Sequence, residues 1–277
     1  MLKDLSTIEL KGFRKISLII KGKFLSFVIS KTNQNLFCKI INFFYSEDGI
    51  INFKDNTYIK IAADGKKIYF PNKRILRVVK SYKLQLDRIF ETYCLNQINF
   101  NDRDVIIDCG SNIGELFLSL EIKNIDVVYF GFEPDKEAFR CLTLNVNDNS
   151  NLYNSALSID NKTSKLFVDD EGGNSSLINF GSKEFVEVNQ ISLDSLNIKS
   201  RIKLFKVEAE GLEPEVLQGA RKTLEHTEFV SVDFGAERGE NQEMTIVETS
   251  KILNELKFEL IAFSEFRMIG LFKNTLI

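Results

Sequence analysis

One stretch of the chain joins an acidic residue and a glycine turn to the end of an apolar run. Val105 to Ile107 is followed by Asp108, and Gly110 and Gly114 come shortly after it. A continuous apolar run is typical of a strand buried on both faces, and open α/β sheets bind ligands at the carboxyl edge of such strands. Glycines let a backbone approach a ligand and begin a helix. The pattern therefore predicts a ligand-binding turn here.

A second acidic residue, Glu133, ends the next apolar run and lies 23 residues after Gly110. In nucleoside-binding βαβ units, an acid about 20 residues beyond the glycine turn meets the ribose hydroxyls. The glycine turn itself lacks the G-x-G-x-x-G pattern that serves a pyrophosphate. Asp108 would repel a pyrophosphate, but it would attract the amino and sulfonium charges of S-adenosylmethionine. The residues favour that cofactor over a nicotinamide dinucleotide, so a nicotinamide-dependent oxidoreductase is the less favoured alternative.

Further carboxylates follow the apolar run 202–207, where we expect another strand. Glu208 and Glu210 stand ahead of a helix that begins near Glu213 and Pro214, so both lie at the carboxyl edge of the sheet. Acids at the start of a helix are also favoured by its dipole, and that purely structural explanation stays open for Glu210 and Glu213.

Five segments of the chain together resemble the FkbM family of S-adenosylmethionine-dependent methyltransferases. The likeness covers roughly residues 100 to 272, and its last segment is the most specific. That segment usually reads K-x-D-x-E-G-x-E in the family, and here Glu208 replaces the usual Asp. The five segments are DCGSNIGE at 108–115, FEPD at 132–135, NSALS at 154–158, SLDSL at 192–196 and KVEAEGLEPEVLQGA at 206–220.

The resemblance implies a set of residues that bind S-adenosylmethionine and an acceptor that is O-methylated. The acceptor class that it implies is a sugar, a glycan or a polyketide-type natural product. The cofactor-binding residues that it implies are Asp108, Gly110, Ser111, Asn112, Gly114, Glu115, Glu133, Pro134, Asn154 and Ala156.

Methyl transfer to an alcohol needs alignment of the reactants and a base for the hydroxyl proton. The chain has a single histidine, His226, which we expect to lie away from the site, so a carboxylate is the expected base. Our order of candidates is Glu210, Asp233 and then Glu208. A second arrangement stays open, in which these acids hold a divalent metal that lowers the pKa of the alcohol.

Several other functions are disfavoured by composition and motifs. Base-modifying methyltransferases use an Asn/Asp-Pro-Pro-aromatic loop or a Pro-Cys pair, and the three prolines, Pro71, Pro134 and Pro214, form neither. The net charge of −3 offers no general attraction to nucleic acid, so we expect no nucleic-acid partner. A non-catalytic cofactor-binding module or scaffold stays open as an alternative, although it would not need the carboxylates after the later strands.

Alternating strands and helices predict an α/β fold, a doubly wound Rossmann-like class I methyltransferase sheet with a C-terminal antiparallel hairpin. The last two strands must be antiparallel because only a few residues join them. An insertion between the third and fourth strands carries two extra strands, near 165–168 and 185–191. We expect strands near 105–108, 126–132, 151–157, 202–207, 228–234, 258–263 and 267–272, and helices near 113–121, 135–145, 213–224 and 243–256.

A small N-terminal α+β extension precedes this sheet. We divide the chain into the extension 1–71, a connecting helix 72–100 and the cofactor-binding domain 101–277. Alternating apolar residues around Asp64-Gly65 predict a β-hairpin over 57–70. Strands at 16–20 and 24–29 and a helix or strand at 36–44 are the weaker indications.

The N-terminal segment 1–31 is basic, with seven Lys or Arg against two acids. A solvated basic face accounts for it, and a weak contact with a membrane surface or an acidic polymer is the alternative. Cys38, Cys94, Cys109 and Cys141 show no metal-ligand spacing, so we expect reduced core cysteines. Neither a secretion signal nor an apolar stretch of about 18 residues is recognisable, and we expect a cytoplasmic protein.

Overall fold

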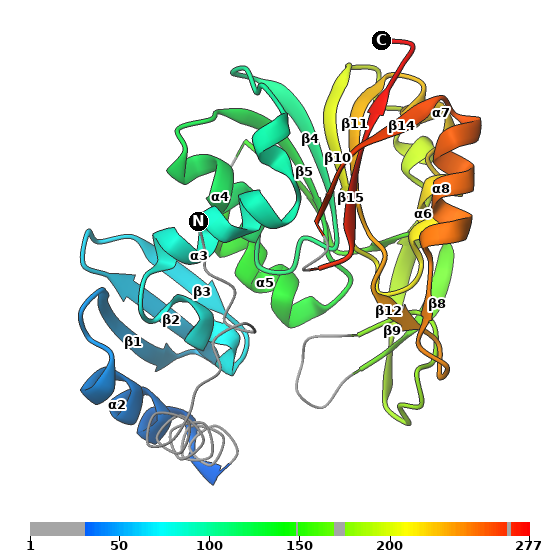
Figure 1. The fold of residues 1–277 in the computed structure, drawn as a ribbon. Coiled ribbons are helices and arrows are strands. Elements are labelled where there is room, and N and C mark those ends of the chain that lie inside the picture. Colours follow the sequence, from blue (N-terminus) through cyan, green and yellow to red (C-terminus); the bar gives the residue numbers. More distant parts are fainter. Residues whose placement is uncertain (1–30, 148, 169–174, 265–266) are drawn as a thin grey trace, which may run out of the picture.

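A computed structural model describes residues 31–147, 149–168, 175–264 and 267–277. Its centre is a seven-stranded sheet with the strand order β14-β15-β11-β10-β4-β5-β6 (Figure 1). The strands are β4 (Asp104–Cys109), β5 (Val127–Phe132), β6 (Asn151–Tyr153), β10 (Ile202–Val207), β11 (Thr227–Asp233), β14 (Phe258–Ser264) and β15 (Ile269–Asn274).

The direction of the strands confirms the predicted fold class. The five strands from β6 to β11 are parallel to their neighbours, whereas β15 is antiparallel to both β11 and β14. The C-terminal hairpin is therefore present as predicted, because its short connection excludes a parallel crossover.

Helices cover both faces of this sheet, as the alternation of buried side chains requires. In β4, Ile106 packs toward α3, α4 and α5, and its neighbours Val105 and Ile107 pack toward α6, α7 and α8. The helices are α3 (Tyr82–Thr92), α4 (Glu115–Ile122), α5 (Lys136–Asn145), α6 (Glu213–Gln218), α7 (Arg221–Leu224) and α8 (Ile246–Glu255).

The N-terminal extension contains α2 (Gln34–Phe44) and an antiparallel sheet of β1 (Gly49–Lys54), β2 (Thr57–Ala62) and β3 (Lys67–Phe70). The predicted hairpin over 57–70 is confirmed, and Gly65 in its turn has a φ of 86° that favours glycine. The strands predicted at 16–20 and 24–29, and the basic segment apart from Lys31, lie outside the described residues.

The prediction of one continuous connecting helix over 72–100 is wrong. The segment forms a 3₁₀ turn, η1 (Lys73–Val78), then α3, then a second 3₁₀ turn, η2 (Leu95–Gln97). Ser81 caps the first turn of α3 through its side chain, and Cys94 adopts a left-handed φ of 58° after it. These local signals end the helix at both sides, although the apolar spacing continues through them.

Two other predicted elements are divided. The strand expected over 151–157 ends at Tyr153 in the central sheet, and β7 (Ala156–Leu157) joins a separate sheet with β8 (Lys162–Phe167) and β9 (Phe185–Ile191). The helix expected over 213–224 breaks between α6 and α7.

The structure also contains η3 (Leu193–Leu196) and a small hairpin of β12 (Ala236–Arg238) and β13 (Glu243–Met244). Among the described residues, no helix is both long and apolar enough to span a membrane.

Asn145, at the end of α5, connects the extension to the central sheet domain. Its side chain accepts a hydrogen bond from the Tyr69 N–H (2.8 Å) and donates to the Tyr69 carbonyl (2.9 Å). It also donates to the carbonyl of Ile113, in the turn between β4 and α4 (2.9 Å). One buried amide therefore fixes β3 and the predicted ligand-binding turn together.

We expect Asn145→Ala to lower the free energy of unfolding by about 2–4 kcal/mol, because it leaves buried backbone groups without partners. Urea denaturation of the full chain measures this change. Asn254→Ala, at an exposed position on α8, is the matched control and should change stability by about 0.5 kcal/mol or less. Equal stability of the two variants would refute the connecting role of Asn145.

Candidate functional site

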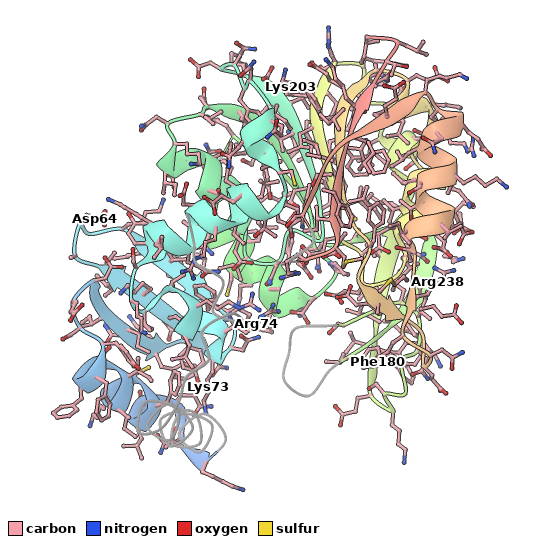
Figure 2. The ribbon with its side chains drawn as sticks, viewed as in Figure 1. Asp64, Lys73, Arg74, Phe180, Lys203 and Arg238 are labelled. Carbon is pink, nitrogen blue, oxygen red and sulfur yellow. The ribbon has the colours of Figure 1, made fainter. Side chains whose placement is uncertain are left out.

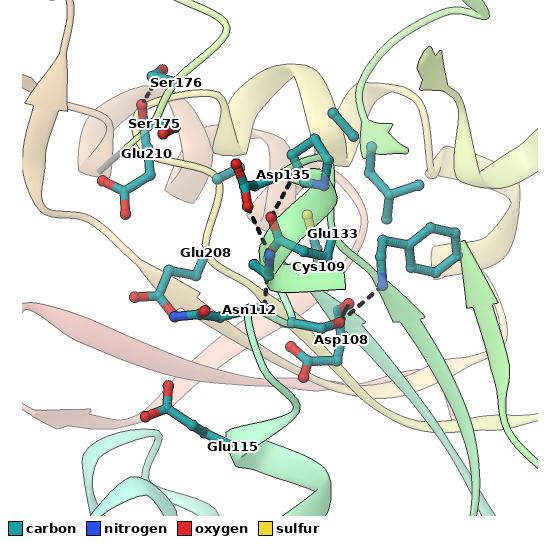
Figure 3. A pocket seen from close by; sticks show the side chains of 18 of the residues that line it. Asp108, Cys109, Asn112, Glu115, Glu133, Asp135, Ser175, Ser176, Glu208 and Glu210 are labelled. Carbon is teal, nitrogen blue, oxygen red and sulfur yellow. Dashed lines mark hydrogen bonds between the residues drawn. The ribbon is translucent and has the colours of Figure 1, made fainter. Parts of the chain in front are cut away.

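The carboxyl ends of β4, β5 and β10 open onto a cavity of about 330 Å³, a volume within the range of small-molecule sites. The separate sheet of β7, β8 and β9 is called the insertion sheet below. Residues from this sheet and from the N-terminal extension complete the wall of the cavity. Most residues that the sequence suggested for the site line this cavity, namely Asp108, Gly110, Ser111, Asn112, Glu115, Glu133, Pro134, Ala156, Glu208 and Glu210 (Figure 3). Their individual roles remain predictions.

Three suggested residues lie outside the cavity lining. Gly114 precedes α4 with a φ of 89°, and a Cβ there would contact the Val146 side chain at 2.9 Å. The Asn154 amide donates to the carbonyls of Glu133 (2.9 Å) and Pro134 (3.1 Å), so it holds the loop after β5. Asp233 is buried and accepts a hydrogen bond from the Gly235 N–H at 2.8 Å.

Glu133 is held by two backbone N–H groups at the end of β5. Its Oε2 accepts from Asn112 and its Oε1 from Asp135, both at 2.8 Å (Figure 3). Burial raises the pKa of Glu133 to about 7, although the two N–H groups oppose this shift. Each carboxylate oxygen has a further lone pair, so the ionised group fits a ribose diol. This observation supports a nucleoside cofactor in the cavity.

Gly110 allows a close approach between two segments of the protein itself. Its φ is 73°, and a Cβ at this position would lie 2.0 Å from the carbonyl oxygen of Glu208. This close packing gives Gly110 a structural role of its own, and its contact with a ligand stays a prediction. The glycine is required because the ends of β4 and β10 touch at this point.

Lys206 is a buried cation between these two strand ends. The register of β4 and β10 pairs it with Asp108, and its Nζ lies 3.0 Å from Asp108 Oδ1 and 3.1 Å from Glu208 Oε2. It also donates to the carbonyls of Cys109 (3.1 Å) and Gly110 (2.8 Å). Burial opposes its charge, but Asp108, Tyr93 and Glu208 outweigh that effect and raise the pKa of Lys206 well above its ordinary value.

Asp108 therefore already has a cation beside it. The Tyr129 hydroxyl donates to its second carboxylate oxygen, Oδ2. Burial raises the pKa of Asp108, while Lys206 and Tyr129 act in the opposite direction. Lys206 therefore largely balances the negative charge of Asp108. As a result, Asp108 attracts the amino group of a cofactor less strongly than an unpaired carboxylate would.

Glu208 is the most strongly stabilised anion of the site. Besides Lys206, it accepts hydrogen bonds from the Tyr93 hydroxyl and, at 3.1 Å, from the Arg267 guanidinium. Burial favours the protonated form, yet Lys206, Tyr93 and Arg267 together lower the pKa of Glu208 to about 2. A carboxylate with such a low pKa is a weak base.

Glu210 lies in a different electrostatic environment only two residues further on. Its backbone is left-handed, with a φ of 50°, and its carbonyl accepts from the Ser176 hydroxyl at 2.8 Å (Figure 3). Burial, followed by the neighbouring Glu237 carboxylate, raises the pKa of Glu210 to about 9. The loop after β10 thus holds one strongly acidic and one strongly basic carboxylate.

Glu213 and Arg238 stabilise the shape of this loop. The Glu213 carboxylate accepts from the N–H groups of Ala209 (3.0 Å) and Gly211 (3.1 Å) and from the Thr245 hydroxyl (3.0 Å). These contacts favour the structural explanation of Glu213 that was left open above. Arg238, at the end of β12, donates two hydrogen bonds to Glu215 in α6, at 2.9 and 2.6 Å. This pair fixes the segment after β11 against α6.

Sequence reasoning missed several residues that line the cavity. Lys206 was a motif position without an assigned role, although a lysine in a buried strand is itself a signal of a charge partner. Arg74, Arg77, Tyr93, Ser176 and Arg267 gave no such signal, because separate parts of the chain bring them to the cavity. In the part of the chain that the structure describes, no group of three or more His, Cys, Asp or Glu residues is arranged to hold a metal ion.

Comparison with known proteins identifies a family profile. The profile described as the methyltransferase FkbM domain matches residues 108–260, which include the end of β4, the whole of β5 and β10, and the loops that follow these three strands. No match was found among curated proteins.

Solved structures show more distant similarity. A Streptococcus agalactiae protein of the NADB-Rossmann superfamily has 15% identity and a TM-score of 0.42, covering 68% of this chain and 67% of its own. A precorrin-6y C5,15-methyltransferase of Geobacter metallireducens has 10% identity and a TM-score of 0.40, covering 67% and 88%. M. capricolum TrmK, solved with S-adenosylhomocysteine, has 8% identity and a TM-score of 0.39, covering 68% of each chain. Other similar structures are described as rRNA or tRNA methyltransferases. These similarities are too distant to indicate an acceptor.

The raised pKa of Glu133 predicts that cofactor binding depends on pH. The ionised carboxylate is the form that accepts two ribose hydroxyls, and it predominates above a pKa of about 7. We expect the affinity for S-adenosylhomocysteine to level off as the pH approaches 8. Below pH 7 it should fall by up to about tenfold per pH unit. Calorimetric titrations between pH 5.5 and 8 measure it. Glu133→Gln should bind more weakly and without this slope, and an unchanged slope in that variant would contradict the assignment.

The buried cation predicts a pH-dependent loss of stability in Lys206→Met. At pH 7 we expect a loss of about 3–5 kcal/mol, because Asp108 and Glu208 then lack their cation. Glu208 has a folded pKa of about 2 against an ordinary 4.5, so its stabilising effect is present above pH 4.5 and disappears as the pH falls toward 2. The difference between wild type and variant should therefore shrink below pH 4.5.

Urea denaturation at pH 7 and pH 3.5 tests the stability change in Lys206→Met. Lys273→Met, at an exposed position on β15, is the control and should cost about 0.5 kcal/mol or less. A loss in Lys206→Met that is equal at both pH values would show that packing, not charge, causes it.

Proposed function

Because this chain belongs to the FkbM methyltransferase domain family, we propose that it methylates a hydroxyl group of a sugar, a glycan or a polyketide-type natural product. The family makes the chain a methyltransferase, and its cofactor is S-adenosylmethionine, which supplies the methyl group as a sulfonium. The alternative of a nicotinamide-dependent oxidoreductase is set aside on this ground. The acceptor class is the part that we propose, and it comes from the family resemblance.

The cofactor would be held mainly by the ends of β4 and β5. Glu133 accepts the ribose hydroxyls in this proposal, and Asn154 keeps the Glu133 and Pro134 backbone in position. The turn with Ser111 and Asn112 is tied to the same carboxylate through the Asn112 N–H. The residues present therefore fit an adenosine group beside the candidate base.

The observation that carries the catalytic part of the proposal is the position of Glu210. It lines the same cavity as Glu133 and is half-buried beside a second carboxylate, Glu237, which raises its proton affinity. A base of high pKa accepts a hydroxyl proton readily once it is itself ionised. We assign Glu210 as the base for this reason.

The other two candidates fit the role less well. Glu208 is committed to Lys206, Tyr93 and Arg267, and its pKa of about 2 makes it a poor proton acceptor. Burial and then Glu208 raise the pKa of Asp233 to about 7, a useful value for a base at neutral pH. Asp233, however, does not line the cavity and accepts from Gly235 and Arg267. His226 contacts the Ile198 carbonyl at 3.0 Å, outside the cavity lining.

Transfer of tritiated methyl groups from S-adenosylmethionine to a panel of acceptors tests the acceptor class. The panel contains free sugars, nucleotide sugars, oligosaccharides and macrolide aglycones, with total tRNA and rRNA as the nucleic-acid arm. We expect labelled methyl ethers of a hydroxylated small molecule or glycan. Label in RNA alone would overturn the proposed acceptor class but not the methyltransferase assignment.

The pH dependence of turnover distinguishes the candidate bases. With the acceptor found in that panel, kcat/KM should rise with pH toward a midpoint near 9 if Glu210 is the base, and near 7 if it is Asp233. Glu210→Gln should lower turnover about 100-fold or more and keep S-adenosylhomocysteine binding. Glu187→Gln, exposed on β9, is the control.

Two further measurements decide between a carboxylate base and a metal. Loss of wild-type activity with a chelator would support a metal-activated alcohol, and insensitivity would support the base. Near wild-type turnover in Glu210→Gln, Asp233→Asn and Glu208→Gln would show that orientation alone drives the reaction.

A further inference from the structure

One end of the cavity is lined by arginines that come from both ends of the chain. Arg74 and Arg77 belong to η1, just after the N-terminal extension, and Arg267 lies between β14 and β15. Figure 2 shows Arg74 on the side of the extension that faces the central sheet. Glu115, at the start of α4, lines the same cavity.

The positive charges in this cavity differ in how they are balanced. Lys206 is paired with Asp108 and Glu208, and Arg267 lies 3.1 Å from Glu208 and 3.4 Å from Asp233. Arg77, by contrast, makes no ion pair or hydrogen bond through its side chain with the part of the chain that the structure describes. Arg74 has further contacts in the molecule.

The surroundings of Arg77 combine repulsion with a shortage of nearby anions. The Arg77 side chain is exposed to solvent in the cavity, and the surrounding protein lowers its pKa by partial desolvation, then by repulsion from Arg74 and Arg267. Glu115 and Glu208 attract it, but neither lies within ion-pair distance. A guanidinium that lines a cavity in this way is suited to an external oxyanion, since its planar fork matches carboxylate and phosphate groups.

We propose that Arg77, with Arg74 beside it, binds a carboxylate or phosphate group of a ligand at this end of the cavity. The proposal deepens the proposed function, and two ligands of that reaction supply the required chemistry. The first is the α-carboxylate of the cofactor, whose amino group would find Glu115 at the same end. The second is an anionic group on the acceptor, such as a sugar phosphate or an acidic glycan.

A pair of cofactor fragments separates these sources. S-adenosylhomocysteine carries the α-carboxylate, whereas 5′-methylthioadenosine has the same nucleoside and lacks the amino-acid group. If the cofactor supplies the anion, calorimetry should show that Arg77→Ala binds S-adenosylhomocysteine about 10-fold or more weakly, because a charge-assisted contact is lost. The affinity for 5′-methylthioadenosine should stay within about twofold of wild type, since no arginine contact to it is proposed.

An anionic sugar tests the acceptor as the source. Glucose 1-phosphate is titrated into free protein and into protein saturated with S-adenosylhomocysteine. Binding that is present in wild type and lost in Arg77→Ala, together with unchanged S-adenosylhomocysteine affinity, would assign the anion to the acceptor. Arg77→Lys keeps the charge without the fork and should restore part of the affinity in either case.

Arg201→Ala is the matched control, because it removes an exposed arginine that pairs with Glu228 outside the cavity. It should leave all three affinities unchanged, and thermal unfolding verifies that each variant is folded. Wild-type affinities of Arg77→Ala for all three probes would overturn the oxyanion site. Failure of the cofactor assignment is recognised separately, because wild-type protein would then bind neither adenosine compound while the glucose 1-phosphate arm still tests Arg77.

Discussion

The site depends on one buried ammonium group, that of Lys206, between the ends of two neighbouring parallel strands. Its four partners are two carboxylates and two backbone carbonyls, and they lie at the end of β4 and just after β4 and β10. A buried cation is costly unless it is fully paired, so this arrangement tolerates little displacement of either strand. The lack of a Cβ at Gly110 is part of the same constraint, since the Glu208 carbonyl occupies that space.

The same cation divides the acids of the cavity into two kinds. Glu208 lies next to Lys206 and is held ionised, whereas Glu210 lies beyond its immediate reach and faces another carboxylate. A loop of three residues therefore presents carboxylates whose pKa values differ widely. Such separation by environment is a common way for one site to contain both a permanent anion and a group that exchanges protons.

The sequence predicted the parts of this arrangement that depend on local pattern. The apolar run before Asp108, the acid at Glu133 and the short connection before β15 each follow from periodicity or spacing, and the structure contains all three elements. The role of Lys206 depends on the register between β4 and β10, which pairs it with Asp108 although the two residues are far apart in the sequence. The helix break near Ser81 depends on a side-chain cap that competes with an uninterrupted apolar spacing. Arg77 and Arg267 reach the cavity only through tertiary packing, for which a single sequence carries no signal.

The division of residues 151–157 between two sheets has a consequence for how the acceptor range could be changed. β6 ends beside the loop that carries Glu133, and after Asn154 and Ser155 the chain enters the insertion sheet through β7. So short a link fixes the offset between the two sheets, and adding or removing a residue there would shift one against the other. The connection between β8 and β9 is longer in sequence, and it does not join the two sheets. The described residues of that connection that line the cavity are Val168, Ser175, Ser176 and Leu177. Substitutions at these four positions would thus alter the cavity wall without changing the offset between the two sheets.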